Sequence, residues 1–122
     1  AVIKGSEFTV HMRVRFTDHI PAPIFAFSFK NVIGTEITGT NTMIEKAFLD
    51  SVEPGQTMDI TFTQKMSLQG GEYLLSLGVT GYENEDFKVY HRLYDVMDIT
   101  VISDKNTVGY YDANSEITVT EE

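Results

Sequence analysis

Hydrophobic and polar residues alternate over most of this chain, as is typical of β-strands with one buried side and one solvent-facing side. The clearest case begins at Phe8, where every second residue up to Phe16 is apolar and the residues between them are polar. A second run places Phe25, Phe27 and Phe29 on one side of an extended segment. The same pattern predicts strands over 8–16, 24–30, 35–40, 57–63, 73–80, 87–94 and 97–102, with a last short strand at 117–119.

The segment 42–52 interrupts this alternation and leaves two structures open. Thr42 and Glu45 have the spacing of a helix capping box, and Ile44, Ala47 and Phe48 have helical spacing. A short helix or helical turn therefore fits, and an irregular edge strand fits equally well. Turns are predicted at 31–34, 54–55 and 70–71, and an acidic loop is predicted at 81–86.

Short strands separated by turn residues, with almost no helix, indicate an all-β fold: an immunoglobulin-like antiparallel β-sandwich. A small β-barrel is the alternative. The length of 122 residues and the hydrophobic content of 42% fit one sandwich domain over residues 1–122. Because the chain has neither cysteine nor tryptophan, phenylalanine must fill the volume that a disulfide and a tryptophan fill in immunoglobulin domains.

The charge balance narrows the possible partners. Lysine and arginine number 9 against 18 acidic residues, which gives a formal net charge of −9. Phosphate attraction dominates nucleic-acid affinity, and here it becomes repulsion, so we predict no nucleic-acid partner. Anionic membrane surfaces are disfavoured for the same reason, whereas a neutral ligand meets no such penalty.

Few residues could support catalysis, and we predict neither a catalytic residue nor a metal site. The three histidines are isolated along the chain, and no zinc-protease, nucleophile-elbow or phosphate-loop motif occurs. Glu83, Glu85 and Asp86 could offer oxygen ligands to calcium, but they lack the spacing of an EF-hand loop. A solvated acidic loop is the favoured interpretation of these three residues.

A tyrosine-rich segment is the first candidate binding site. Tyr82, Tyr90 and Tyr94 lie in or beside the acidic loop, together with His91. Aromatic rings can pack against the apolar C–H faces of sugars while polar neighbours bind the hydroxyl groups. We predict that these four residues contact carbohydrate. The alternative is that some of the tyrosines belong to the core with only their hydroxyls at the surface.

A basic stripe is the second candidate. His11, Arg13 and Arg15 occupy alternate positions of the first clear strand and therefore share its outer side. Arginine can donate forked hydrogen bonds to sugar hydroxyls or to carboxylates, so we include the three residues in the predicted carbohydrate-binding set. A solvated stripe that offsets the acidic balance is the alternative.

Several motifs resemble one family. The segment Pro23-Ile-Phe-Ala-Phe27, a loop with Gly34 and the segment Ile37-Thr-Gly-Thr-Asn-Thr42 resemble the C-terminal domain of Wzt, the ATP-binding subunit of ABC transporters that export O-antigen and related polysaccharides. The segments 52–55, 68–77, 91–95 and 99–101 also look like landmarks of that family. The resemblance covers about residues 5–110, and Gly-Thr-Asn-Thr is its most specific part.

The resemblance implies a function. It implies a non-catalytic domain that binds a cell-surface polysaccharide in the cytoplasm, at the inner face of the membrane. The domain would be the C-terminal fragment of a longer chain whose nucleotide-binding domain carries the ATP and Mg²⁺ chemistry and contacts the permease. The domain itself would need no cofactor. Members of the family form homodimers, some by exchanging terminal strands.

The motif also departs from the family pattern in places. Ala22 and Ala26 stand where the family usually has asparagine and glycine. We interpret the Gly-Thr-Asn-Thr motif as structural, with Gly39 permitting an unusual backbone angle and Asn41 and Thr42 bonding the local backbone. Two other functions stay open: an extracellular immunoglobulin-like adhesion or interaction module, and a small glycosidase or metal enzyme.

Overall fold

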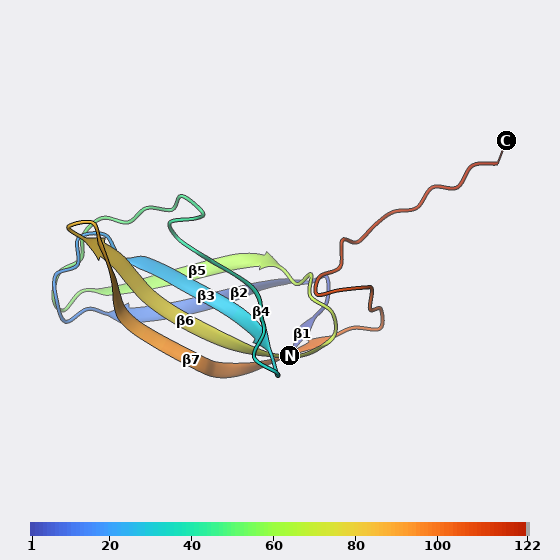
Figure 1. The fold of residues 1–122 in the computed structure, drawn as a ribbon, viewed down its shortest axis with the longest axis horizontal. Coiled ribbons are helices and arrows are strands. Elements are labelled where there is room, and N and C mark those ends of the chain that lie inside the picture. The colour runs from blue at the N-terminus through green and yellow to red at the C-terminus, as the bar shows by residue number, and fades with distance from the viewer. Residues whose placement is uncertain (122) are drawn as a thin grey trace.

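The computed structural model describes residues 1–121, which contain seven strands and no helix. The strands are β1 (Val2–Ile3), β2 (Glu7–Arg15), β3 (Ile24–Asn31), β4 (Glu36–Asn41), β5 (Thr57–Lys65), β6 (Gly71–Glu83) and β7 (Asp86–Ile102). A five-stranded sheet in the order β1-β7-β6-β3-β4 lies over a two-stranded sheet of β2 and β5 (Figure 1). This confirms the predicted β-sandwich. All pairings are antiparallel except that of β1 with β7, which is parallel.

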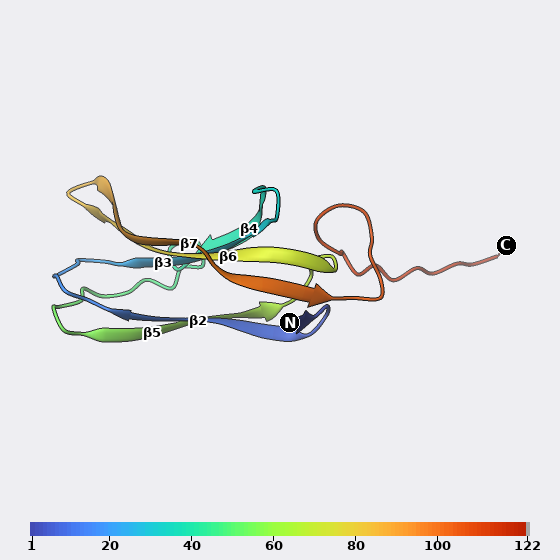
Figure 2. The same cartoon turned by 90° about the horizontal axis from the view of Figure 1, so that it is seen from below.

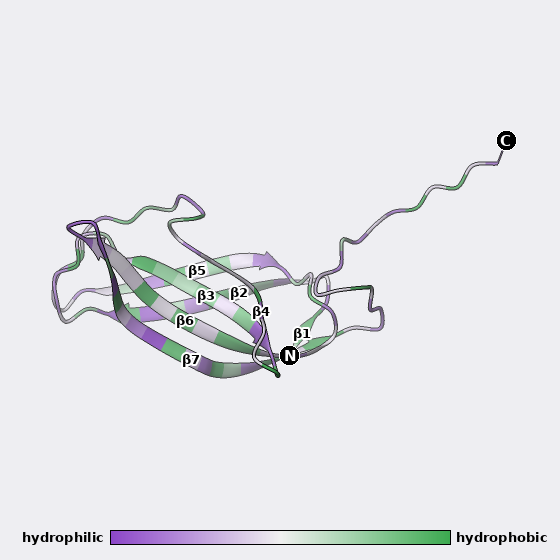
Figure 3. Ribbon diagram, viewed as in Figure 1, coloured by the Kyte–Doolittle hydropathy of each residue, from purple (hydrophilic) through white to green (hydrophobic). Residues whose placement is uncertain are grey.

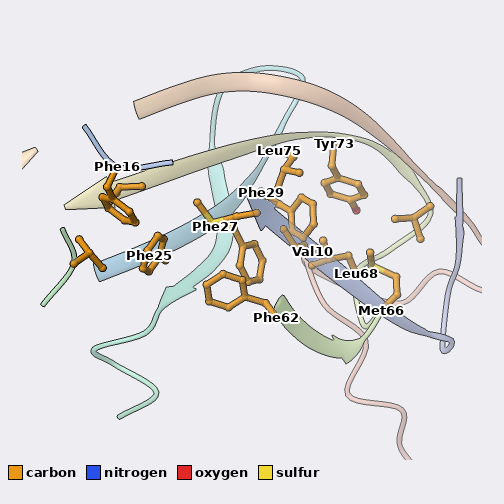
Figure 4. Packing of buried hydrophobic residues seen from close by; sticks show 14 of the residues in the cluster. Val10, Phe16, Phe25, Phe27, Phe29, Phe62, Met66, Leu68, Tyr73 and Leu75 are labelled. Carbon is orange, nitrogen blue, oxygen red and sulfur yellow. The ribbon is translucent and has the colours of Figure 1, made fainter. Parts of the chain in front are cut away.

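The core lies between the two sheets and is built from the alternating apolar residues. Phe25, Phe27 and Phe29 of β3 are 0%, 6% and 2% exposed and point toward the two-stranded sheet (Figure 4). The ring of Phe27 lies 4.9 Å from that of Phe62 on β5 and 5.6 Å from that of Phe29. Phenylalanine therefore fills the interior as predicted, and the colour of each ribbon changes along its length with the alternation (Figure 3).

The structure differs from the predicted elements in two places and decides between the alternatives in a third. The strands predicted at 87–94 and 97–102 are one long strand, β7. The segment 42–52 begins with a helical turn, in which the backbone N–H of Glu45 donates to the carbonyl of Asn41, so the helical-turn alternative is confirmed. It then continues as a loop and ends at a single bridge between Val52 and Ile20. No strand forms at 117–119. There the chain is extended, and Ile117 and Val119 are each 85% exposed.

The Gly-Thr-Asn-Thr motif shapes the turn that leaves β4. The side-chain oxygen of Asn41 accepts a hydrogen bond from the backbone N–H of Ile44 at 2.7 Å. The Thr42 hydroxyl accepts one from the backbone N–H of Phe25 at 3.1 Å. The Asn41 contact confirms the predicted bond to the local backbone, whereas Thr42 bonds the backbone of β3, 17 residues away. The reason predicted for Gly39 is wrong, because its backbone is not in the left-handed region. Glycine is needed there because a Cβ would lie 2.7 Å from the carbonyl oxygen of Phe27.

Replacing Gly39 with alanine should therefore destabilise the domain by about 1–3 kcal/mol, since the clash is with backbone that cannot move aside cheaply. Urea unfolding followed by circular dichroism measures the change. Gly78→Ala on β6 is the matched control, because a Cβ at Gly78 meets nothing closer than 3.8 Å. Equal stabilities of the two variants would contradict the steric explanation.

A buried ion pair joins the two ends of the domain. The Nζ atom of Lys4, just after β1, lies 2.8 Å from the Oδ2 atom of Asp112, and the Nζ atom of Lys105 lies 3.2 Å from the same oxygen. The Lys4 and Asp112 side chains are only 10% and 5% exposed. Lys4 also donates to the backbone carbonyl of Lys105 at 2.7 Å. These contacts fix the place from which the C-terminal tail leaves the sandwich.

The ion pair makes this anchor sensitive to acid. The hydrogen bond from Lys4 and the backbone N–H of Asn114 lower the pKa of Asp112 from 3.8 to about 2. Because the folded-state pKa is the lower one, the carboxylate stabilises the anchor fully above its ordinary pKa. That contribution is lost as the pH falls toward 2. A carboxyl-carbon NMR titration should give a midpoint of about 2 for Asp112. Lys4→Met should raise this midpoint, and an ordinary midpoint in the unaltered protein would contradict the anchor.

Candidate functional site

The predicted acidic loop is a tight hairpin turn. β6 runs to Glu83 and β7 starts at Asp86, so only two residues connect them. These residues, Asn84 and Glu85, have φ angles of 51° and 70°, as a two-residue turn with left-handed central residues requires. Within residues 1–121 no group of three or more histidine or acidic side chains is placed to hold a metal ion. The same part of the chain contains no helix that could cross a membrane.

Two β-bulges in β7 decide where its side chains point. The first leaves Tyr90 without a partner on β6, because its neighbours Val89 and His91 pair with consecutive β6 residues. The second covers 94–96 and contains Asp95, whose φ is 54°. A bulge re-aims the side chains around it. The tyrosine-rich segment is therefore divided between the two sides of the sheet.

The outer side of the β6–β7 hairpin, which faces away from the two-stranded sheet, carries exposed aromatic rings. Tyr82 and Phe87 are cross-strand partners whose ring centroids lie 5.4 Å apart. Farther along β7, the guanidinium of Arg92 donates a hydrogen bond to the Tyr94 hydroxyl at 3.3 Å. Tyr94 is 67% exposed. We call Tyr82, Phe87, Val89, Arg92 and Tyr94 the aromatic face.

The outer side of the five-stranded sheet also carries polar groups. Figure 2 shows the tips of the β6–β7 and β3–β4 hairpins turned away from the two-stranded sheet. The Nζ atom of Lys30 is 2.8 Å from an Asp95 carboxylate oxygen, and the Asp95 backbone N–H donates to the Ser76 hydroxyl at 3.0 Å. The surface thus combines rings with hydrogen-bonding groups.

Tyr90 lies on the inner side and packs against the core. A Cβ on Gly81 would lie 3.0 Å from the Tyr90 ring, so the ring covers this glycine. The Tyr90 hydroxyl is buried and has no hydrogen-bond partner among residues 1–121. Burial raises the pKa of Tyr90, and the neighbouring Glu83 carboxylate adds to the rise. We therefore assign Tyr90 to packing, as in the alternative considered for the tyrosines.

The other predicted residues lie on two different sides of the sandwich. A groove of about 320 Å³ lies between the edge of β2 at 11–15 and the inner side of β6 and β7, where His91 is among the lining residues. The side chains of the basic stripe lie on the outer side of β2, opposite the buried Met12. The structure therefore does not join the basic stripe and His91 into one cluster. The groove is lined by His11, Met12, Arg13, Val14, Arg15, Leu77, Gly78, Val79, His91 and Leu93.

The strongest local contact of the basic stripe is with Asp59 on β5. The His11 ring nitrogen Nε2 lies 3.0 Å from an Asp59 carboxylate oxygen, and the Arg13 Nε atom lies 4.0 Å from it. Arg15 has no acidic partner at ion-pair distance in the described chain. All these side chains are more than half exposed, so solvent screens the pairs and their effect on stability is small.

A larger groove that sequence reasoning missed lies along the opposite edge. It has a volume of about 940 Å³ and separates β4 from β5, with the loop after β4 across it. Threonine residues of both strands are among the lining residues, together with Phe48, whose ring is 77% exposed. Alternating threonines in both strands were the available signal. Their meeting could not be read from the sequence, because β4 and β5 belong to different sheets.

These features define an immunoglobulin-like β-sandwich domain whose aromatic and basic groups lie on open surfaces and edges. The family model described as the Wzt C-terminal domain matches residues 1–113, and the chain belongs to this family. The family is linked to the handling of polysaccharides by ABC exporters.

The fold also matches a solved structure, described as the crystal structure of the C-terminal domain of wzt. The TM-score is 0.89 at 24% sequence identity, over 98% of this chain and 74% of that one. At this identity the likeness shows the shared sandwich fold. No curated protein matches the chain.

Proposed function

We propose that this domain binds the polysaccharide cargo of an ABC exporter, O-antigen or a related cell-surface glycan, and does so without catalysis. The aromatic face is the observation that carries the proposal. Tyr82 and Phe87 are 48% and 52% exposed, so the paired rings offer apolar surface to a ligand. Sugar rings present apolar C–H faces to such residues, and Arg92, farther along β7, can donate hydrogen bonds to sugar hydroxyls.

The family supports a proposal about the setting of the domain. We propose that it works in the cytoplasm at the inner face of the membrane, as one part of a chain that also carries a nucleotide-binding domain. ATP and Mg²⁺ would act in that other domain, which would contact the permease. The net charge of −9 supports a glycan in preference to a nucleic acid.

The test is a titration of the isotope-labelled domain with the surface polysaccharide of the cells that produce it, followed by amide NMR shifts. We expect shifts along β6 and β7 around the aromatic face at millimolar repeat unit, because ordering a flexible glycan costs much of the contact energy. Dextran serves as the unrelated control polymer. Absence of any shift at that concentration, or equal shifts with dextran, would contradict specific binding of the cargo.

We also propose that the domain is a homodimer. Ile117 and Val119 alternate with polar residues in a tail that no strand of the same chain covers within the described residues. The two-stranded sheet leaves one edge of β2 and one edge of β5 free. A second copy of the chain could cover the apolar side of this tail, and the tail could pair with one of the free strand edges of that copy. Sedimentation should show a dimer that becomes a monomer when residues 115–122 are deleted; a monomeric full chain would contradict this.

A further inference from the structure

The segment that follows β7 is held to the sandwich mainly by polar contacts. Of residues 104–121 only Asp112 is buried, and the apolar side chains of Val108 and Tyr111 are 96% and 65% exposed. One isolated bridge, between Leu68 and Tyr111, is the only strand-like pairing of these residues. Because little apolar surface is buried here, the position of this segment depends on its hydrogen bonds and ion pairs.

Lys4 is at the centre of these polar contacts. A lysine ammonium group has three hydrogen atoms to donate, and here each has an acceptor. The acceptors are the side-chain oxygen of Gln69 at 3.0 Å, the backbone carbonyl of Lys105 at 2.7 Å and the Oδ2 atom of Asp112 at 2.8 Å. The same Gln69 oxygen accepts a hydrogen bond from the backbone N–H of Thr107 at 3.0 Å. One ammonium group thus connects three points of the segment, directly or through Gln69.

Lys4 is itself held by the shortest strand of the described chain. β1 has two residues, lies at the edge of the five-stranded sheet and pairs only with β7. Ile3 is 64% exposed, and Val2 is the β1 residue that packs against the core. The Lys4 backbone N–H continues the pairing by donating to the Ile102 carbonyl at 2.9 Å. Displacement of β1 would therefore withdraw the ammonium group from its acceptors.

Burial makes the two movements depend on each other. The Lys4 and Asp112 side chains are only 10% and 5% exposed. When one member of a buried ion pair is removed, the other charge is left without its partner, which costs far more than the loss of an exposed pair. Displacement of β1 leaves the Asp112 carboxylate in this state, and release of Asp112 leaves the Lys4 ammonium in it. Each movement therefore makes the other easier.

From these contacts we infer that Lys4 is a latch that couples the position of β1 to that of the C-terminal tail. With β1 in the sheet, the latch holds residues 103–112 and fixes where the tail leaves the sandwich (Figure 1). With β1 displaced, this segment detaches and the tail is released with it. The use of the latch rests on the proposed function, in which a nucleotide-binding domain precedes β1 and the tail pairs with a second copy. A pull on β1 would then control how the tail is presented for dimer formation.

Amide hydrogen exchange, measured by NMR on the full chain at fixed pH, tests whether the two parts open together. In the unaltered domain the amides of Lys4, Thr107 and Asp112 should share one opening free energy, because they belong to one cooperative unit. Their protection factors should agree within about threefold and lie at least about tenfold below that of Phe27 on the inner strand β3. Opening of β1 and of residues 103–112 at different free energies would overturn the inference.

Two variants test the coupling in each direction. Lys4→Met should speed exchange of the Thr107 and Asp112 amides at least about tenfold. Asp112→Asn should speed exchange of the Lys4 and Gly5 amides by a similar factor, because coupling is reciprocal. Since Asp112→Asn is nearly isosteric, it still gives this measurement if Lys4→Met does not fold. The combined variant should exchange no faster than the faster single one, whereas multiplied effects would show independent contacts and overturn the latch.

Lys105→Met is the matched control. It removes a second lysine that lies 3.2 Å from the same Asp112 oxygen, but this lysine is 54% exposed and belongs to the segment itself. It should therefore change exchange of the Lys4 amide much less than Asp112→Asn does. The Asn31 amide, which bonds Thr35 in the β3–β4 turn, should exchange alike in all variants. If Lys105→Met has as large an effect at Lys4 as Asp112→Asn, the cause is charge in general and the inference is overturned.

A deletion imitates the displacement itself. Removal of residues 1–3 takes β1 away but keeps Lys4, and it should speed exchange of the Thr107 and Asp112 amides at least about tenfold. Unchanged exchange would overturn the inference. The glycan titration is a separate measurement. If the polysaccharide shifts the aromatic face but exchange is not coupled, the latch fails and the proposed function stands. If exchange is coupled but the polysaccharide shifts no residue, the latch stands and the proposed function fails.

Discussion

Replacing Phe27 with alanine should lower the free energy of unfolding by about 3–5 kcal/mol. The side chain is 6% exposed and lies between the rings of Phe29 and Phe62, which come from the two opposed sheets. Alanine would leave a cavity that these neighbours cannot close, because each is held by its own strand. A loss of this size is a large part of the stability of a small domain. Urea unfolding followed by circular dichroism measures it.

Phe48→Ala is the matched control for this prediction. Phe48 is 77% exposed in the loop after β4, so its removal should change the free energy of unfolding by no more than about 0.5 kcal/mol. The two variants delete the same atoms and differ only in burial. Similar unfolding curves for both would mean that Phe27 does not hold the sheets together, and the assignment of the core to β3 would be wrong.

The fold could be predicted because its main determinant is a pattern with period two. Alternation along residues 8–16 and 24–30 specified both the strands and the buried side of each, and the structure follows it except at Ile24, which is buried although it lies opposite the phenylalanines. The remaining segments differ in outcome. At 117–119 the alternation predicted a strand, but a strand needs a partner, and no strand of the described chain covers Ile117 and Val119. At 42–52 the helical spacing holds for one turn, which ends at Lys46 with a left-handed φ of 59°.

The candidate site was less predictable, because it depends on bulges and on which strands become neighbours. Because His91 is close in the sequence to Tyr90 and Tyr94, we predicted that the three residues belong to one binding site. The bulges in β7 instead leave Tyr94 on the outer side and place Tyr90 and His91 on the inner side. No pattern in one sequence marks a bulge reliably. The approach of His91 to the edge of β2 likewise arises from the sandwich topology, which brings together segments about 80 positions apart.

Replacing Tyr82 with alanine should weaken polysaccharide binding roughly thirtyfold, equivalent to about 2 kcal/mol, the loss that an aromatic residue at the centre of a binding surface commonly causes. The ring stands on the outer side of β6 and packs only against Phe87 among aromatic neighbours in the described residues. Its removal should leave the unfolding curve nearly unchanged. Calorimetric titration with the native polysaccharide measures the affinity.

Two further variants decide what the ring contributes. Tyr82→Phe keeps the apolar ring and removes the hydroxyl, so it should retain most of the affinity if stacking on sugar C–H groups is the main interaction. Tyr110→Ala removes a tyrosine of similar exposure, 56%, from the C-terminal segment and should bind as the unaltered domain does. If Tyr82→Phe loses as much affinity as Tyr82→Ala, the hydroxyl is the essential group. If Tyr82→Ala binds normally, the aromatic face is not the glycan surface, and the threonine-lined groove between β4 and β5 becomes the next place to test.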